Sequence, residues 1–450
     1  MNRAREILNV IPGPPGSPVL GLALELRRDM LKTLDEGFGR YGDLVSYRLG
    51  PPALGKQIIA AHHPEAVRRV LTDRAVFGRR TKSIEVLSEL FGQNLVTTDG
   101  EVWLRQRRTL QPLFTARHVV EYAKIMQAEA DRLVRSGTIA EGEAIDLVPA
   151  TENYALRVLG RTIMRDELVM ADVIEAFNSL VPLIGQVARK RSLKLWKMPL
   201  RVPTRDTRQF MAVRAEIYRL IGQVLARRKE QQVPQAEPDL LDRLRRAGDP
   251  ETGTPLTSAE VADQALIMLV AGHTTTSNAL TFALYLLGRN PEIQKTVAEA
   301  ARGESGPPDQ DLVTAAIHEA MRLYPSAYVI GRRTTGETEL GGHLIPANTN
   351  VLVSPWVTHR HPRFWERPAE YDPTRFIGAK DRPRYAYLPF GGGPRDCIGQ
   401  HFAMLEASIL LRTLLRVYTI TSMDADLPVS QLVSLRPTGA VRVRFDQRKA

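Results

Sequence analysis

The sequence predicts a mainly α-helical protein with a minor β region, folded as one large domain over residues 1–450. Two observations predict this fold class. Apolar residues recur with helical spacing in several long segments, the longest of which runs from residue 257 to residue 290. Short strand-like runs are concentrated around residues 40–62 and 326–355, so strands form a small part of the fold.

The composition is that of an ordinary globular protein. The chain is 43% hydrophobic and 25% charged, and it is long enough to bury a large core. Cys397 is the single cysteine, which excludes a disulfide framework within the chain. No secretory signal opens the sequence, and no run of about 18 apolar residues occurs. We therefore expect a cytoplasmic, monomeric protein without a transmembrane anchor.

The formal charge of +11 restricts the kind of partner. A basic field attracts nucleic acid, a membrane surface or an acidic protein. Aromatic residues are only 6% and basic residues are spread along the chain, so we expect no nucleic-acid binding. Residues 189–205 hold seven basic residues with apolar ones interleaved, which suits either a membrane surface or a solvated helix and loop. Pro199 and Pro203 interrupt any helix and favour the second interpretation.

The N-terminal half contains a stiff lead-in, two strands and two helical blocks. The Pro-rich lead-in, residues 11–18, is expected to be extended. Strands are predicted at residues 45–49 and 57–61, and helices at residues 118–134 and 151–183. The polar stretch from residue 229 to residue 255 indicates a surface loop around one short helix, residues 239–246.

The C-terminal half is dominated by three helices. Thr257 and Glu260 have capping-box spacing and start a helix of roughly 34 residues, about 50 Å long, that ends before Pro291. The remaining predictions are a helix at 309–324, strands at 328–334 and 350–354 around a Gly341-Gly342 turn, and a last helix at 400–415.

The most informative stretch is Phe390-Gly-Gly-Gly-Pro-Arg-Asp-Cys-Ile-Gly399. Its glycines permit backbone conformations closed to other residues and let a large flat ligand approach closely. Cys397 precedes a helix, whose N-terminus stabilises a thiolate, and Arg395 is placed to neutralise a carboxylate on the same ligand. A thiolate held in this way suits the axial ligand of a haem iron. The alternatives are a small buried hydrophobe and a nucleophile with a positioned His base.

The spacing Phe-x-x-Gly-x-Arg-x-Cys-x-Gly resembles the haem-binding loop of the cytochrome P-450 family. Glu319-Ala-Met-Arg322 matches the family's Glu-x-x-Arg, and Arg375 fills the position of its third member, so these residues are expected to form a structural network beneath the haem. Trp103 and Arg107 resemble a pair that holds a haem propionate. Arg332 falls where the family often places another propionate-binding Arg, although Arg333 follows it directly.

The resemblance therefore implies haem b (iron protoporphyrin IX), with Cys397 as the iron ligand. The other residues that it places at the haem are Trp103, Arg107, Ala271, Gly272, Arg332, Phe390, Gly393, Arg395 and Gly399.

Residues 271–277, Ala-Gly-His-Thr-Thr-Thr-Ser, lie near the middle of the longest helix. Gly and β-branched hydroxyl residues are poor helix formers, and their hydroxyls bond back to preceding carbonyls, which predicts a local opening. In the family this opening holds dioxygen, and Thr275 matches the alcohol that assists proton delivery. The family usually has Asp or Glu where this chain has Thr274. The proton-delivery role of that acid is then taken by water, by a group of the substrate or by His273, or the reaction is not ordinary hydroxylation. Of these, His273 is expected to be a packing residue.

The resemblance implies a monooxygenase that inserts one oxygen of O2 into a medium-sized lipophilic substrate. A terpenoid, a fatty acyl group and a polyketide- or peptide-derived molecule all fit. The sequence shows no dinucleotide fingerprint or fused reductase, so electrons are expected from a separate ferredoxin or flavodoxin and its reductase, docked by part of the basic excess. The substrate pocket is expected at residues 79–95, 181–202, 270–271 and 326–330 and near Val433.

Two other functions stay open at this point. Thr274 is compatible with oxidative coupling, ring formation or peroxide-driven oxidation by a haem-thiolate enzyme. A haem-binding sensor or carrier without turnover is the second alternative, and the presence of Thr275 argues against it.

Overall fold

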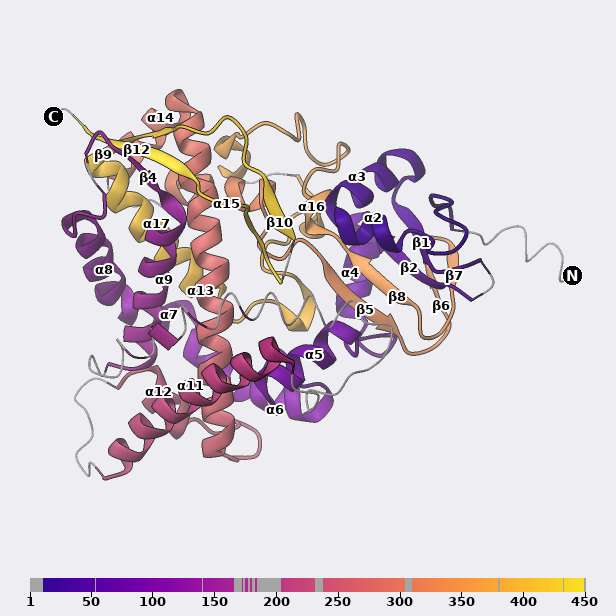
Figure 1. The fold of residues 1–450 in the computed structure, drawn as a ribbon, viewed down its shortest axis with the longest axis horizontal. Helices are drawn as coiled ribbons and strands as arrows, with labels where there is room; N and C mark the ends of the chain where they lie inside the picture. The colour runs from indigo at the N-terminus through magenta and orange to yellow at the C-terminus, as the bar shows by residue number, and fades with distance from the viewer. Residues whose placement is uncertain are drawn as a thin grey trace, which may run out of the picture. The chain divides into compact units, whose positions relative to one another are not determined.

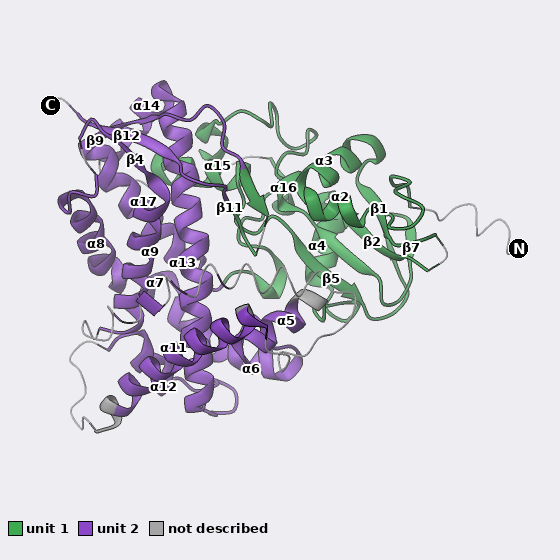
Figure 2. Ribbon diagram, in the orientation of Figure 1, with its two compact units in different colours: residues 1–81, 307–397, 429–436 green, residues 82–306, 398–428, 437–450 purple. Residues whose placement is uncertain are grey.

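A computed structural model describes residues 11–52, 54–139, 141–165, 204–230, 238–303, 310–378, 381–431 and 433–448, together with residues 172, 175, 176, 179 and 183. The chain divides into two compact units, each built from segments that are distant in sequence (Figure 2). Unit 1 comprises Met1–Thr81, Pro307–Cys397 and Val429–Arg436, and unit 2 comprises Lys82–Gly306, Ile398–Pro428 and Pro437–Ala450. Folding as a single domain over residues 1–450 stays a prediction.

Unit 1 is organised around a five-stranded sheet of order β1-β2-β8-β5-β3 (Figure 1). Strands β1 and β2 pair antiparallel, whereas β2 and β8 pair parallel although almost 300 residues separate them. All four predicted strands are confirmed within two residues at each end. The five strands are β1 (Leu44–Leu49), β2 (Lys56–Ala61), β3 (Phe77–Gly78), β5 (Ile330–Thr334) and β8 (Asn350–Val353).

Two further features of unit 1 were predicted. Ser46 N–H donates to the Pro12 carbonyl at 2.8 Å, so the start of the lead-in lies beside β1, whereas Gly16, with a φ angle of 64°, departs from the extended backbone expected over residues 11–18. Gly341 and Gly342 join β6 (Thr338–Leu340) to β7 (His343–Ile345), and their positive φ angles of 56° and 81° are those that a type I′ turn requires.

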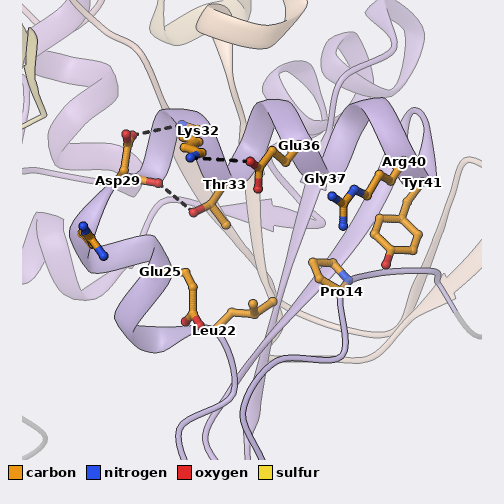
Figure 3. A pocket seen from close by; sticks show the side chains of 11 residues that line it. Pro14, Leu22, Glu25, Asp29, Lys32, Thr33, Glu36, Gly37, Arg40 and Tyr41 are labelled. Atoms are coloured by element: carbon orange, nitrogen blue, oxygen red, sulfur yellow. Dashed lines mark hydrogen bonds and ion pairs between the residues drawn. The ribbon is translucent and has the colours of Figure 1, made fainter. Parts of the chain in front are cut away.

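The helices of unit 1 are α2 (Ala23–Arg28), α3 (Met30–Tyr41), α4 (Pro64–Thr72), α15 (Leu312–Leu323) and α16 (Pro355–Thr358). Asp29 caps α3 by accepting from Lys32 N–H at 3.0 Å. Helices α2 and α3 border a surface groove of about 460 Å³ with charged side chains along it (Figure 3). Lys32 and Glu36 pair with each other in this groove at 3.9 Å, so part of its charge is neutralised internally.

Unit 2 is mostly helical. Its longest helix, α13, packs mainly against α9, and a three-stranded sheet of order β4-β12-β9 completes the unit. The helices that matter below are α5 (Lys82–Phe91), α6 (Gly100–Leu110), α8 (Ala123–Arg135), α9 (Leu147–Ile163), α11 (Arg205–Glu230), α12 (Leu240–Arg246), α13 (Ser258–Arg289), α14 (Pro291–Arg302) and α17 (Gln400–Val417). The strands are β4 (Ala144–Asp146), β9 (Tyr418–Ser422) and β12 (Arg442–Gln447). Within the described ranges, none of the helices is both long and apolar enough to cross a membrane.

The predicted capping box at the start of α13 is present. Thr257 Oγ1 accepts from Glu260 N–H at 3.2 Å, and the Glu260 carboxylate accepts from Thr257 N–H at 2.9 Å. The helix then continues without interruption to Arg289, so the predicted local opening at residues 271–277 is wrong. Thr275 Oγ1 does bond back to the Ala271 carbonyl at 2.7 Å, but the helix accommodates this bond without breaking.

Two helical predictions need correction. The block at 118–134 is not one helix, because a short 3₁₀ turn, Val120–Tyr122, separates α7 (Ala116–Val119) from α8. Helix α9 ends at Ile163, because the backbone of Met164 is extended at φ −138° and ψ 113°, so the block at 151–183 is not one continuous helix; beyond the break, the described residues 172, 175, 176, 179 and 183 are helical as predicted. The short helix predicted at 239–246 is confirmed as α12, with Asp239 as its N-cap. The basic segment at 189–205 and the pocket segment at 181–202 lie almost wholly outside the described residues.

Candidate functional site

The loop before Cys397 owes its shape to its glycines. Gly391 and Gly393 have φ angles of 74° and 71°, which favour glycine. A Cβ on Gly393 would lie 2.5 Å from the Leu71 carbonyl oxygen of α4, and one on Gly392 would lie 2.7 Å from the ring of Tyr385. The backbone is therefore packed as closely as glycine allows against the rest of unit 1.

The loop presents its cysteine to the outside. Cys397 N–H donates to the Phe390 carbonyl at 2.9 Å, which closes the loop, and the Cys397 side chain is exposed. The alternative that Cys397 is a small buried hydrophobe is therefore wrong. The neighbouring Phe390, Gly393 and Arg395 are partly exposed in the same loop, and Gly399 is the N-cap of α17 directly after it.

Below this loop, the predicted Glu-Arg-Arg network forms as expected. Arg322 donates to both carboxylate oxygens of Glu319, each at 2.7 Å, and both side chains are fully buried. Arg375 Nε donates to Glu319 Oε1 at 3.2 Å. Arg322 Nη1 donates to the carbonyls of His359 and Pro368, and Nη2 also donates to the carbonyl of Glu370. Because every charged group has several partners, the network fixes the segment that leads to the cysteine loop.

His359 connects the network to the loop, and the sequence analysis did not identify it. Its Nε2 accepts from Leu388 N–H at 2.9 Å, and its Nδ1 lies 3.3 Å from the Arg322 carbonyl. Burial, with the nearby Arg322 charge, lowers the pKa of His359 to about 3, so the ring is neutral and Nδ1 carries the proton. A histidine in a turn gives little sequence signal, because its partners here are backbone groups.

In unit 2, one turn of α13 differs from the rest of the helix. Residues 276–287 are all buried, whereas Ala271 and Thr275 are exposed, one turn apart on the same face. Gly272 lies next to them, and a Cβ there would approach Leu159 of α9 to 3.0 Å, so its bare side faces α9. His273 is buried, as expected of a packing residue, and burial lowers its pKa to about 4. Thr274 Oγ1 lies 3.5 Å from His273 Nδ1.

The three predicted propionate ligands differ in burial. Trp103 is buried and Arg107 is partly buried one turn later on α6 in unit 2. Arg332 is buried on β5 in unit 1 and donates to the Gly331 carbonyl at 2.9 Å. Its neighbour Arg333 is exposed and donates to the Asn348 carbonyl. Their contact with haem stays a prediction.

A second buried group was also missed. Glu406 of α17 is fully buried, and neither of its carboxyl oxygens has a hydrogen-bond partner among the described residues. Burial raises its pKa well above the ordinary value, because the charged form would lose its hydration. An acidic residue on the apolar face of the predicted helix was the available signal.

These features fit the haem that the motifs imply. A cradle that only glycine can form holds one exposed thiol in unit 1, and a long buried helix exposes a small residue and a hydroxyl in unit 2. The loop of unit 1 has the thiol and the bare backbone that a large flat ligand with a central metal needs at close approach.

Comparison with known proteins gives a consistent result. The Cytochrome P-450 family model matches residues 11–441. Cyclooctatin synthase of Streptomyces melanosporofaciens is 33% identical over 88% of this chain and 87% of its own length. Cyclooctat-9-en-7-ol 5-monooxygenase of the same organism is 32% identical over 89% and 87% of the two chains. Pentalenene oxygenase of Streptomyces avermitilis is 30% identical over 97% of each chain. The crystal structure of the cytochrome P450DA haem domain has the same fold, with a TM-score of 0.84, 24% identity and coverage of 98% and 99% of the two chains.

Proposed function

Because the chain belongs to the cytochrome P-450 family, a group of haem b-dependent monooxygenases, we propose that it oxidises a terpenoid with electrons from a separate ferredoxin or flavodoxin. The observation that carries the proposal is the exposed turn of α13, where Ala271 and Thr275 lie directly before the fully buried residues 276–287. The relatives support the substrate class, since two of them are named for a cyclic alkenol and for pentalenene. A terpenoid is favoured over the fatty acyl, polyketide and peptide alternatives for this reason.

When bound, haem would supply the activation of O2, in which two electrons and two protons reduce one oxygen atom to water and the other is inserted into the substrate. The protein supplies the environment for this chemistry. Cys397 provides the thiolate ligand, and the loop holds its backbone fixed through the Phe390 carbonyl. The Thr275 hydroxyl is held in place because it donates a hydrogen bond to the Ala271 carbonyl. Its oxygen can therefore accept a hydrogen bond from a proton donor at the exposed face of the helix. Arg332, Trp103 and Arg107 would hold the propionates.

The first experiment tests thiolate ligation. We expect the dithionite-reduced protein to show a strongly red-shifted Soret band with carbon monoxide, and Cys397→Ser to lose it while it retains haem. Folded, haem-loaded protein that shows no such band would disprove the assignment of Cys397. The sensor or carrier function would then be tested by ligand spectra without turnover.

The second experiment tests the substrate class and the fate of oxygen. Titration with cyclic terpene hydrocarbons and alcohols, against fatty acids of equal carbon number, should give a low-to-high-spin Soret shift with terpenoids at lower concentration. Turnover with a ferredoxin or flavodoxin and its reductase under ¹⁸O₂ should place one labelled atom in the product. A preference for fatty acids would overturn the terpenoid proposal.

Thr274 favours a second candidate reaction, which is oxidative coupling or ring formation in which the substrate gains no oxygen. A threonine lacks the proton chemistry of the usual acid, and the neighbouring His273 is neutral and buried. The same ¹⁸O₂ experiment separates the two reactions, because coupling gives product without label. Turnover with hydrogen peroxide and no reductase would identify a peroxide-driven enzyme.

The redox partner is tested by ionic strength. If part of the +11 charge docks an acidic electron carrier, turnover should fall steeply as salt is raised while the dissociation constant of the substrate stays constant. Turnover that is indifferent to salt would contradict this docking mode.

A further inference from the structure

One carboxylate of α13 holds two other elements of unit 2. Asp263 Oδ1 accepts a hydrogen bond from the Tyr218 hydroxyl of α11 at 2.5 Å. Asp263 Oδ2 accepts from the backbone N–H of Gln93 at 2.8 Å. Gln93 lies in residues 92–97, the loop that follows α5, here called the 92–97 loop. The two oxygens of a single side chain therefore bind two segments that are more than 100 residues apart in sequence.

The loop approaches this carboxylate as closely as a backbone can. Gly92 has a φ angle of 75°, and a Cβ at this position would lie 2.4 Å from Asp263 Oδ2. The contact therefore leaves no space for a side chain on the loop or for a longer acid on the helix. A side chain at position 92 would therefore displace either the Asp263 carboxylate or the loop from their present contact.

Tyr218 is also held in place by a residue of its own helix, α11. The Arg214 guanidinium lies 4.7 Å from the centroid of the Tyr218 ring, and its Nη2 donates to the Tyr218 hydroxyl at 3.3 Å. Burial and the bond to Asp263 raise the pKa of Tyr218 to about 12, so the hydroxyl stays a donor at neutral pH. Beside this bond, Phe91 and Phe210 pack edge-to-face with centroids 5.9 Å apart, and both rings are buried.

Other hydrogen bonds fold the loop without reaching α11. Leu95 N–H donates to Gln264 Oε1, and Gln106 Nε2 donates to the Gln93 carbonyl, each at 3.2 Å. Loss of Asp263 would therefore leave the loop attached to α6 and α13. What it would remove is the fixed separation between the loop and α11.

This separation matters for the site proposed above. Residues 92–95 and Val270 belong to the segments that the sequence analysis assigns to the wall of the substrate pocket. Val270 follows Asp263 by seven residues, two helical turns later on the same face of α13. Leu95 and Val96 of the loop are apolar side chains that remain partly exposed, as expected of residues that contact a lipophilic substrate.

We propose that Asp263 is a positioning residue that fixes the 92–97 loop relative to α11 and thereby sets the size of ligand that the enzyme admits. The inference rests on the proposed function for its substrate pocket. The geometric part, one carboxylate joining the loop and the helix, is testable without any substrate.

The test uses the haem-loaded protein and four variants: Asp263→Ala, Asp263→Asn, Tyr218→Phe and, as a matched control, Tyr285→Phe. Tyr285 is also on α13, and its hydroxyl donates to the Ala425 carbonyl at 3.1 Å, away from the 92–97 loop in sequence. Hydrogen–deuterium exchange reports on the loop and on α11. Stopped-flow binding of 4-phenylimidazole and of imidazole, followed by the Soret shift, reports on admission of a bulky and a small ligand.

We expect Asp263→Ala to raise exchange in both the loop and α11, and to raise the association rate of 4-phenylimidazole relative to imidazole about threefold to tenfold, the equivalent of one lost hydrogen bond. Asp263→Asn should keep the Gln93 N–H on its one acceptor oxygen and turn its NH2 group toward the Tyr218 hydroxyl, so that α11 is released more than the loop. Tyr218→Phe should loosen α11 more than the loop, and Tyr285→Phe should change neither the exchange nor the ligand ratio.

Unchanged exchange and an unchanged ligand ratio in Asp263→Ala, with an intact carbon monoxide band, would overturn the inference. If Asp263→Ala fails to fold, Asp263→Asn and Tyr218→Phe carry the same test with smaller changes of shape. Absence of the carbon monoxide band from the unmodified protein would instead disprove the proposed function. The exchange data would then still decide whether Asp263 holds the loop and α11.

Discussion

Leu388 N–H donates a hydrogen bond of 2.9 Å to Nε2 of His359, a fully buried and neutral imidazole. The same ring contacts the Arg322 carbonyl through Nδ1, so it connects the end of α15 to the residues that enter the cysteine loop. The position of Cys397 thus depends on the hydrogen bonds of His359 as well as on the glycines of the loop itself.

Replacement of His359 by phenylalanine should therefore destabilise unit 1. The change fills the space but leaves the Leu388 N–H buried without an acceptor, which costs about 1–3 kcal/mol. Urea unfolding followed by circular dichroism measures the loss, and the exposed His401→Gln serves as a control that should change stability by less than about 0.5 kcal/mol. Equal stability of His359→Phe and the unmodified protein would show that the bond contributes nothing.

The chain offers a direct comparison of a buried and an exposed Glu–Arg pair at the same spacing. Glu319 and Arg322 are fully buried, whereas Arg367 and Glu370 are 57% and 55% exposed. Glu319→Gln leaves the buried Arg322 charge without its counterion and should lower the free energy of unfolding by about 3–5 kcal/mol. Glu370→Gln should cost at most about 1 kcal/mol. Similar losses for the two variants in urea unfolding would contradict the burial argument.

The buried Glu406 should make stability depend on pH. Its pKa is raised in the folded protein, so above about pH 4.5 the unfolded chain loses this proton while the folded chain keeps it. The folded state is therefore penalised by up to about 1.4 kcal/mol for each pH unit above that point, until the folded pKa is reached. Glu406→Gln should remove the penalty, so its stability relative to the unmodified protein should rise with pH. A protonated-carboxyl infrared band that Glu406→Gln lacks would confirm the charge state directly.

His62 should make the stability of the protein fall as the pH is lowered, which is opposite to the effect of Glu406. Neither ring nitrogen has a hydrogen-bond partner among the described residues, and burial lowers its pKa to about 3. Below about pH 6.5 the unfolded chain binds a proton that the folded chain does not, so stability falls as the pH falls. His62→Phe, which packs beside Phe38, removes this dependence. Between about pH 7 and about pH 5 the stability difference between variant and unmodified protein should grow by about 2 kcal/mol; a constant difference would contradict the prediction.

Much of the fold was predictable because its signals are local. The capping box of Thr257 and Glu260, the glycines at 341–342 and the motif around Cys397 each depend on residues within a few positions of one another. The 3₁₀ turn at Val120–Tyr122 and the end of α9 were missed, because apolar spacing continues through both. His359 and Asp263 were missed for another reason: their partners are backbone groups or residues far away in sequence, which leave no pattern at the position itself.

The parallel pairing of β2 with β8 also has a consequence for biosynthesis. Ile58 pairs with Asn350, so nearly 300 residues must leave the ribosome before β2 gains its second neighbour, β8. Until then the β1–β2 hairpin presents an open edge with Ile59, Ala60 and Ala61, which are all buried in the finished protein. Such a nascent chain is prone to aggregate at this edge, and chaperone supply should limit the yield of active enzyme more than the stability of the completed fold does.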